Sequence, residues 1–319
     1  MCYSAQIWAD YRKFTKVFGA IMDVKEFVRM FWERVDGAKI KIPKAMEAAF
    51  ADPQTEQERQ IQSLIAAYGV DQAGKTEQEL FKQTKRLADA ERTLQLKTTK
   101  AAVESKRIAA DKIEKAKGKL ADLRRTQLEP RDSRIFPGNY APVMVMEDGK
   151  RVIKPMRYQC RPAGKPAFYD TRFPGTYNAR RDSLDRFWKG QFGVTHGILV
   201  ANSFFENVSL HRNEGRELAP EEIEKNVILQ FRPEQEQDML FACLWSVWKG
   251  PGQPDLISFA IITDDPPPEI AIAGHDRCPI PLKPQNVDAW LNPDPNDLVA
   301  QYAILDDRER PHYAYRMAA

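Results

Sequence analysis

The sequence predicts an α+β fold in which a β-rich body carries a long helical insertion. Two observations lead to this class. From about Thr76 to Leu128 the chain contains no proline and only one glycine, Gly118, which is typical of uninterrupted helix. From Pro130 onward, short apolar runs rich in β-branched and aromatic residues alternate with Pro, Gly and Asn, which is typical of strands joined by turns.

The first 50 residues are expected to enter the body and form one of its helices. Apolar side chains recur there at spacings of three and four, as on one face of a helix: Phe27, Met30, Phe31 and Val35. We therefore divide the chain into an N-terminal body segment, a helical insertion, and the rest of the body with an exposed C-terminal tail from Arg308: residues 1–50, 51–130 and 131–319.

The insertion has a heptad pattern. Apolar residues recur every seven positions and then shift in phase: Leu80, Leu87, Leu94, Ala101 and Ile108, followed by Ile113 and Leu120. This pattern predicts one long helix or a helical hairpin with a coiled-coil-like stripe. Two interpretations stay open: a solvated arm, or a surface for a protein partner, self-association or a DNA backbone, the last favoured by the basic stretch Lys106–Arg125.

The C-terminal half is expected to supply most of the strands. Five runs have the length and composition of strands: Pro142–Met146, Gly197–Val200, Val227–Phe231, Leu240–Trp248 and Leu256–Thr263. A short helix is expected at Asn286–Leu291. The sheet and this helix then complete the body.

Composition excludes several classes of protein. With 43% hydrophobic, 10% aromatic and 29% charged residues, the chain is expected to be soluble and globular. No apolar run approaches the ~18 residues of a membrane span, and the N-terminus lacks the pattern of a secretory signal. We expect a cytoplasmic protein without membrane partners. The net charge of +3 does not by itself indicate a nucleic-acid partner.

The four cysteines are widely spaced and form no Cys-x-x-Cys pair: Cys2, Cys160, Cys243 and Cys278. Such cysteines in a chain of this size are usually free thiols rather than disulfides or zinc ligands. We therefore expect neither a metal site nor a cofactor, and treat the last three as core thiols.

Cys2 is the exception, because aminopeptidases remove Met1 when the second residue is small. A chain that begins with cysteine presents an amine and a thiol on adjacent carbons, both partly in reactive form at neutral pH. An aldehyde can condense with the amine, and the thiol can then close a five-membered thiazolidine within the same residue. Cys2 is therefore a candidate nucleophile.

Three further positions are candidates for proton transfer or anion binding. His275 is flanked by charged residues in a loop after an apolar run, which suits a proton shuttle beside an anionic substrate, with Arg277 as its anion-binding neighbour. Glu206 follows two phenylalanines, and partial burial would raise its pKa towards a useful acid/base value. Asn178 follows a Pro-Gly turn and offers an amide to a reacting oxygen. Each residue also has an ordinary structural interpretation.

The order of these residues resembles the SRAP (SOS-response-associated peptidase) family. The matching segments are Met1-Cys2, Tyr140-Ala141-Pro142, Asn178-Ala179-Arg180, Phe204-Phe205-Glu206, Phe241-Ala242-Cys243-Leu244-Trp245, His275-Asp276-Arg277-Cys278-Pro279 and Trp290-Leu291. The likeness covers the first few residues and roughly Ile135–Asn292, with the helical segment as an insertion.

The resemblance implies a sensor of abasic sites in single-stranded DNA that becomes covalently linked to the damaged strand. Cys2 would form a thiazolidine with the open sugar aldehyde after removal of Met1, which members are credited with catalysing themselves. Glu206 would be the acid/base, His275 would protonate or orient the sugar ring oxygen, and Asn178 would position Cys2. Arg180 and Arg277 would hold the flanking phosphates, and a lyase side reaction is a further expectation.

The chain departs from the family pattern where DNA would be contacted. Tyr3-Ser4 replaces the usual Gly-Arg, and Asn207 replaces a Trp after the strand-end Glu. Base stacking on an aromatic side chain is worth roughly 1–3 kcal/mol, so these changes affect DNA engagement more than the covalent chemistry. Tyr3 and Tyr158 are the residues expected to compensate.

Two alternatives from other classes remain. The same Cys2 and His275, with Asn178 as an oxyanion donor, would also serve an N-terminal-nucleophile peptidase or amidase. A non-enzymatic module that binds DNA and recruits a partner through its helical arm is the other.

Overall fold

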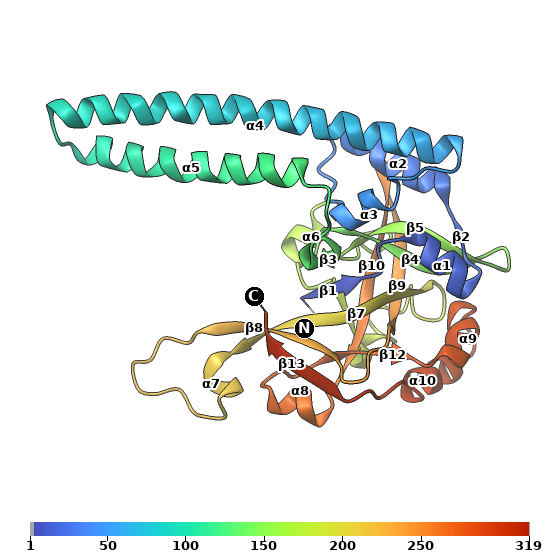
Figure 1. The fold of residues 1–319 in the computed structure, drawn as a ribbon. Coiled ribbons are helices and arrows are strands. Elements are labelled where there is room, and N and C mark those ends of the chain that lie inside the picture. Colours follow the sequence, from blue (N-terminus) through green and yellow to red (C-terminus); the bar gives the residue numbers. More distant parts are fainter. Residues whose placement is uncertain (1–2, 319) are drawn as a thin grey trace. The chain divides into compact units, whose positions relative to one another are not determined.

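The computed structural model describes residues 3–318 and has the expected α+β class: a large mixed sheet, with helices that include a long hairpin (Figure 1). The chain separates into two compact units. The first, called here the body, comprises Met1–Met30, Lys39–Asp52 and Glu129–Ala319. The second comprises Phe31–Ala38 and Pro53–Leu128.

The body is built around a sheet whose strands follow the order β12-β9-β10-β5-β4-β7-β1-β3. An additional pairing of β7 with β9 closes the middle of this path into a ring. In that order, the strand bounds are Pro281–Leu282, Met239–Gly250, Gln253–Asp264, Lys150–Tyr158, Tyr140–Glu147, His196–Ser209, Ser4–Ile7 and Arg134–Ile135. The five predicted strands correspond to β4, β7, β9, β10 and a further strand, β8 (Asn226–Pro233).

Shorter strands extend the sheet at its margins. β2 pairs with β5, β6 and β11 pair with β10, and β8 pairs with β7 and β13. Their bounds are Ile21–Met22 (β2), Asn178–Arg180 (β6), Cys278–Pro279 (β11), Asn226–Pro233 (β8) and Tyr313–Met317 (β13). β13 adds to one expectation, because the C-terminal segment is paired with β8 as a strand, although Tyr315, Arg316 and Met317 are exposed as expected of a tail.

Short helices surround the body sheet. Their bounds are Tyr11–Phe18 (α1), Val24–Val35 (α2), Lys44–Ala48 (α3), Tyr169–Arg172 (α6), Leu210–Asn213 (α7), Pro268–Ile272 (α8), Val287–Leu291 (α9) and Leu298–Asp306 (α10). Three 3₁₀ turns are Pro130–Ser133, Arg181–Ser183 and Pro284–Asn286. α2 contains the apolar residues predicted to form a helix, and its last part belongs to the second unit.

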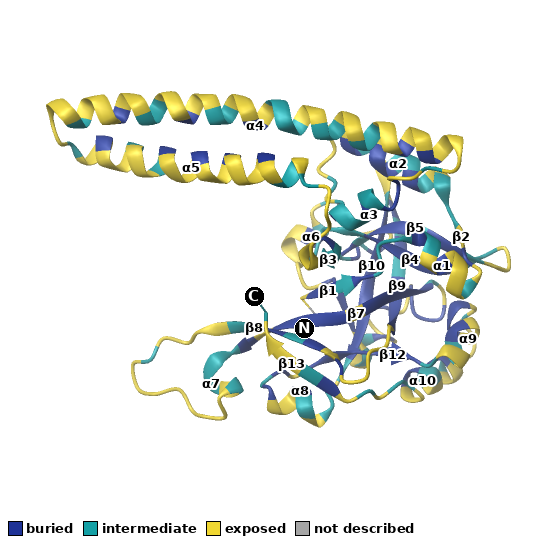
Figure 2. Ribbon diagram, viewed as in Figure 1, coloured by how far each residue is buried: buried dark blue, intermediate teal, exposed yellow. Residues whose placement is uncertain are grey.

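The core of the body lies between the strands, where Figure 2 shows almost continuous burial. It is dominated by large apolar side chains that alternate along β7, β8, β9 and β10, and Phe204, Phe231, Phe241 and Phe259 are all fully buried. Phe204 stacks on Phe231 with ring centroids 5.3 Å apart. The core therefore fixes the strands that carry the residues predicted to be functional.

The second unit is a hairpin of two antiparallel helices, α4 (Glu56–Leu96) and α5 (Lys100–Arg124) (Figure 1). Each begins at a threonine whose hydroxyl accepts a backbone N–H bond from three residues ahead: Thr55 for α4 and Thr99 for α5. α4 thus starts about 20 residues before the position predicted from proline and glycine spacing, since residues 56–75 also contain no proline.

The buried seam of the hairpin agrees with the predicted stripe at Ile113 and Leu120 and differs from it at the leucines of α4. The fully buried heptad positions are Thr76, Gln83 and Ala90 on α4 and Ala102, Ala109, Ala116, Ile113 and Leu120 on α5. Leu80, Leu87 and Leu94 are only partly buried. Small residues at the seam allow two helices to approach closely.

Charges on the hairpin are largely matched within it. Lys106 contacts Glu91 at 3.0 Å, Lys112 contacts Glu79 at 3.6 Å, and Arg124 contacts Glu77 at 3.2 Å, all across the two helices. Such exposed pairs each add little stability. These pairs nevertheless neutralise basic side chains of the stretch Lys106–Arg125, whose charge favoured a DNA contact.

Gly118 of α5 provides a test of the hairpin. Its backbone is helical, and a Cβ there would meet no atom within 4 Å. Gly118→Ala is therefore expected to stabilise α5 by about 0.5–1 kcal/mol, because alanine loses less backbone entropy in a helix. Hydrogen exchange of α5 amides should slow accordingly.

Gly138 of the body is the matched control. It also has open space around the position of a Cβ, but its φ is +92°. Gly138→Ala should therefore destabilise the protein, since alanine is strained in that conformation. Faster amide exchange in α5 after Gly118→Ala would contradict the expectation.

Candidate functional site

A cavity of about 330 Å³ opens where the N-terminal strand meets β7. Its lining comes from five separate segments of the chain: Tyr3, Tyr177, Phe205, Glu206, Asn207, Ile228 and His275. β1 pairs antiparallel with β7 so that Ser4 lies opposite Phe205. This register places Tyr3, the first described residue, beside the glutamate predicted to act as an acid/base.

Glu206 is fully buried on β7. Burial raises the pKa of its carboxyl to about 8, partly offset by a hydrogen bond with the backbone of Tyr3. Desolvation disfavours the charged carboxylate, and opposing interactions are too weak to restore the ordinary value. The carboxyl is therefore protonated at neutral pH, which agrees with the raised pKa expected from the two preceding phenylalanines.

His275 reaches Glu206 from the loop after α8. Its Nε2 lies 3.3 Å from Glu206 Oε2, and its Nδ1 lies 2.9 Å from the carbonyl oxygen of Arg277. The turn needs Gly274, whose φ is +96° and where a Cβ would lie 2.8 Å from the side chain of Val208. The loop is thereby held close enough for the histidine to contact the glutamate.

The Glu206–His275 contact joins two neutral groups. Burial lowers the pKa of His275 to about 4, so the imidazole is unprotonated at neutral pH. Nδ1 lies 2.9 Å from the Arg277 carbonyl oxygen and 3.3 Å from the Arg277 backbone nitrogen. In the tautomer that carries its proton on Nδ1, Nε2 can accept the carboxyl proton of Glu206. The pair thus places one proton between a weak acid and a weak base, both buried.

These pKa shifts predict a specific dependence of stability on pH. Between pH 4.5 and about 8 the folded protein holds the Glu206 proton more tightly than the unfolded chain, so stability falls as pH rises. His275 has the opposite effect between about pH 4 and 6.5. The two effects offset each other below pH 6.5, and the decline from Glu206 remains from there to about pH 8.

Between pH 6.5 and about 8, titration of Glu206 should lower the free energy of unfolding by roughly 2 kcal/mol. Glu206→Gln should abolish this part of the decline, because glutamine does not titrate. Urea unfolding of both proteins across the window measures the difference. Parallel stability curves for wild type and variant would contradict the assigned protonation states.

The other predicted site residues lie at different depths. Asn178 is buried at the start of β6, opposite Ile261 of β10, and directly follows Tyr177 of the cavity. Arg180, two residues later, is about half exposed and pairs with Asp182 at 2.9 Å. Cys2, the predicted nucleophile, lies outside the described residues.

The residues predicted to contact DNA separate into surface and buried positions. Tyr3 is 44% exposed and borders the cavity, whereas Arg277 is only 8% exposed. Tyr158 is fully buried and stacks on Phe259 with ring centroids 5.3 Å apart. The structure therefore places Tyr158 in the core of the body, where its ring has no face for a base, because β5 turns it inward.

The remaining cysteines lie in the core. Cys160, Cys243 and Cys278 are free thiols and buried, and burial raises the pKa of each, to about 12 for Cys160. Within residues 3–318, no three His, Cys, Asp or Glu side chains gather as metal ligands would. In the same range, no helix is both long and apolar enough to cross a membrane.

One residue beside the cavity has no signal in the sequence. The guanidinium of Arg134, on β3, lies 3.6 Å from the ring centroid of Phe205, and its Nε donates to Ser4 Oγ at 3.0 Å. Arg134 pairs in register with Gln6 of β1. Only this strand pairing, which joins residues about 130 positions apart, brings Arg134 to the site.

Comparisons with known proteins agree with this picture. Residues 95–316 match the family described as SOS response associated peptidase (SRAP), a range that includes Asn178, Glu206 and His275. No curated protein matches the chain.

Three solved structures are similar to part of the chain. A protein from Bordetella bronchiseptica is 15% identical, with 61% of this chain and 90% of that chain covered and a TM-score of 0.46. A protein from Bacteroides thetaiotaomicron is 14% identical, with 58% and 77% covered and a TM-score of 0.47. A phage-related protein from Bordetella bronchiseptica is 20% identical, with 58% and 80% covered and a TM-score of 0.42. Because the family match spans most of its length, the chain belongs to the SOS response associated peptidase family.

Proposed function

We propose that this protein captures abasic sites in single-stranded DNA through a covalent bond to Cys2, once Met1 has been removed. The observation that carries the proposal is the neutral Glu206–His275 pair in a cavity bordered by Tyr3. Cys2 directly precedes Tyr3 in the sequence. Membership in a family associated with the SOS response supports DNA damage as the setting.

The proposed reaction joins one aldehyde, one amine and one thiol. The Cys2 α-amine adds to the aldehyde carbon of the opened sugar, and the resulting carbinolamine loses its hydroxyl as water to give an imine. The Cys2 sulfur then adds to the imine carbon, the imine nitrogen takes the thiol proton, and a thiazolidine closes. One water is released overall, and no oxidant or reductant is needed.

Glu206 has the protonation state that the dehydration step requires. A carboxyl protonated at neutral pH can give its proton to the departing hydroxyl, and its carboxylate can recover a proton later. His275 can accept or return that proton through Nε2, which lies 3.3 Å from Glu206 Oε2.

Because Asn207 replaces the tryptophan of the family pattern, other side chains would have to contact the DNA. Asn207 lines the cavity at the position after Glu206, and exposed Tyr3 lies at its border. Tyr3 packs edge-on against Phe136, with centroids 5.7 Å apart, which leaves it a supported aromatic surface. We propose that Tyr3 stacks on a base next to the abasic nucleotide, and that Arg180 binds a phosphate.

A denaturing gel tests the proposal directly. Protein shown by mass spectrometry to lack Met1 is mixed with a labelled oligonucleotide that carries one abasic site. A slow-migrating band that survives denaturant is expected for wild type and absent for Cys2→Ala. An undamaged oligonucleotide is the second control.

Cys2→Ser separates the two chemical steps. Serine keeps the amine but lacks the thiol, so it should give an imine that borohydride traps and that reverses without it. If processed wild-type protein forms no adduct but is labelled at Cys2 by an electrophilic peptide and turns over an amide, the peptidase alternative replaces the proposal.

A further inference from the structure

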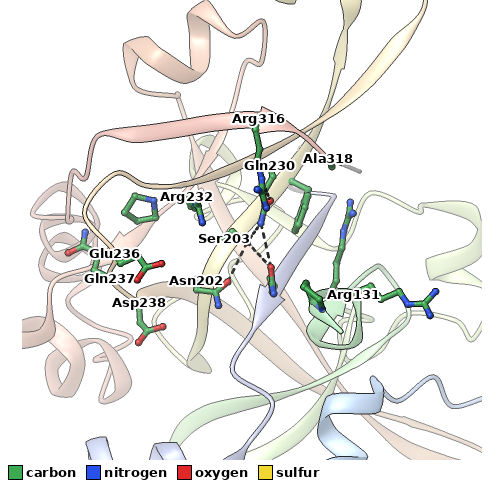
Figure 3. A pocket seen from close by; sticks show the side chains of 15 residues that line it. Arg131, Asn202, Ser203, Gln230, Arg232, Glu236, Gln237, Asp238, Arg316 and Ala318 are labelled. Atoms are coloured by element: carbon green, nitrogen blue, oxygen red, sulfur yellow. Dashed lines mark hydrogen bonds between the residues drawn. The ribbon is translucent and has the colours of Figure 1, made fainter. Parts of the chain in front are cut away.

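A second, larger cavity of about 710 Å³ lies on the body, and Figure 3 shows the side chains that line it. Phe205 of β7 lines both cavities. We propose that this cavity binds backbone phosphates of the DNA strand on one side of the captured abasic nucleotide. The inference rests on the proposed function and extends it to a subsite.

Uncompensated arginines carry the proposal. Arg134, Arg232 and Arg316 line the cavity, and within residues 3–318 none of them forms an ion pair with a carboxylate. Most other arginines of the body do, as Arg181 and Arg308 show. Cations left without a carboxylate beside a cavity create a positive potential that favours an anionic ligand.

The floor of the cavity orients one of these arginines. Gln230 Nε2 donates to Ser203 Oγ at 3.0 Å, and Ser203 Oγ donates to Gln6 Oε1 at 3.3 Å. Arg316 Nε donates to Gln230 Oε1 at 3.0 Å. Its other guanidinium nitrogens donate no hydrogen bond to the described residues. A polar network that spans β1, β7, β8 and β13 therefore presents Arg316 to the cavity (Figure 3).

Arg134 connects the cavity to the candidate catalytic pair. Its guanidinium stacks on Phe205, the residue directly before Glu206, and its Nη2 has no hydrogen-bond partner in the described part of the chain. The positive charge thus extends from the larger cavity to the edge of the smaller one. A strand whose abasic sugar reaches Glu206 would have its next phosphates in this field.

The acidic side of the cavity limits where the strand can lie. Glu236 and Asp238 also line it and, with Gln237, lie together at one side in Figure 3, away from Arg131. Asp238 accepts a hydrogen bond from the indole of Trp8 at 2.6 Å. Repulsion from these carboxylates would keep a phosphate on the arginine side, where the guanidinium groups can donate to its oxygens.

Salt dependence of binding is the test, because each phosphate contact releases counterions from the DNA. Arg232→Gln/Arg316→Gln is compared with Arg310→Gln/Lys150→Gln, which removes the same charge from exposed positions outside the cavity. Fluorescence anisotropy reports binding of a single strand with a tetrahydrofuran abasic analogue, which cannot react. Circular dichroism checks that all proteins fold.

The cavity variant should bind about tenfold more weakly, and its slope of log affinity against log salt should decrease by about 1.4, or 0.7 for each lost contact. The control variant should stay within about twofold of wild type, by the same reasoning on distant charges. Equal slopes for the two variants would overturn the inference. So would loss of inorganic phosphate binding in the cavity variant with its affinity for the DNA strand unchanged, because a small phosphate ligand would then be the occupant.

The covalent reaction separates this inference from the proposed function. With a reactive abasic oligonucleotide below saturation, the Arg310→Gln/Lys150→Gln control should form adduct at the wild-type rate, and the cavity variant should form it more slowly in proportion to its weaker binding. Adduct formation with identical salt dependence in all proteins would leave the function standing and remove the subsite. Binding that depends on these arginines without any adduct would support the subsite and exclude the proposed covalent function.

Discussion

Replacing Glu206 with glutamine is expected to slow covalent capture of an abasic site by about 10²–10⁴-fold, the usual contribution of a positioned acid/base. Glutamine matches the shape of the carboxyl and can still donate to Nε2 of His275, 3.3 Å away in the native contact. It cannot release a proton to the departing hydroxyl. The loss should therefore appear in the rate at saturating DNA, measured by quenched-flow sampling and denaturing gels.

Two measurements distinguish this loss from a structural effect. Affinity for the unreactive tetrahydrofuran strand should be unchanged in Glu206→Gln, because the substitution leaves the DNA-facing residues in place. The wild-type rate should fall as pH rises through about 8, where Glu206 loses its proton, and the variant should lack this fall. Glu234→Gln, at an exposed position, is the matched control. A variant that captures DNA at the wild-type rate would exclude Glu206 as the acid.

Much of the fold could be read from the sequence because its signals are local. Strand-length apolar runs between turn residues located β4, β7, β8, β9 and β10, and the absence of proline located the helical insertion. The seam of the hairpin was less accessible. Heptad counting selected the large residues Leu80, Leu87 and Leu94, whereas the closest packing uses the smaller Ala90, Ala102 and Ala109. Periodicity finds a face of a helix but not which residues of that face lie at its centre.

The candidate site was predictable only where short motifs marked it. Glu206 and His275 are 69 positions apart by their numbers, and their contact arises from the loop at Gly274 and the path of β7. Arg134 reaches the same place through pairing of β3 with β1, which no local pattern indicates. Tyr158 was misplaced because an aromatic residue in a strand has the same appearance in the sequence whether it points inward or outward. Its burial depends on Phe259 of another strand.

Trp290 shows how the C-terminal part of the body is held against β7. Its ring is fully buried and stacks on His196 with centroids 3.9 Å apart, and its Nε1 donates to the Gly197 carbonyl at 3.0 Å. His196 Nε2 accepts from Gly193 N–H at 2.8 Å, so its Nδ1–H donates to the Trp290 carbonyl at 3.0 Å. Burial lowers the pKa of His196 to about 3, which keeps this arrangement neutral and intact at physiological pH.

Trp290→Ala is therefore expected to destabilise the body by about 3–5 kcal/mol, through the cavity left behind and the orphaned Gly197 carbonyl. Trp290→Phe, which keeps most of the ring but not the N–H, should cost about 1–3 kcal/mol. Phe168→Ala, at a side chain that is 57% exposed, is the control and should stay within about 0.5 kcal/mol. Urea unfolding followed by circular dichroism ranks the three. A Trp290→Ala midpoint no lower than that of Phe168→Ala would mean that α9 contributes little to the body, and that β7 holds Glu206 in place without it.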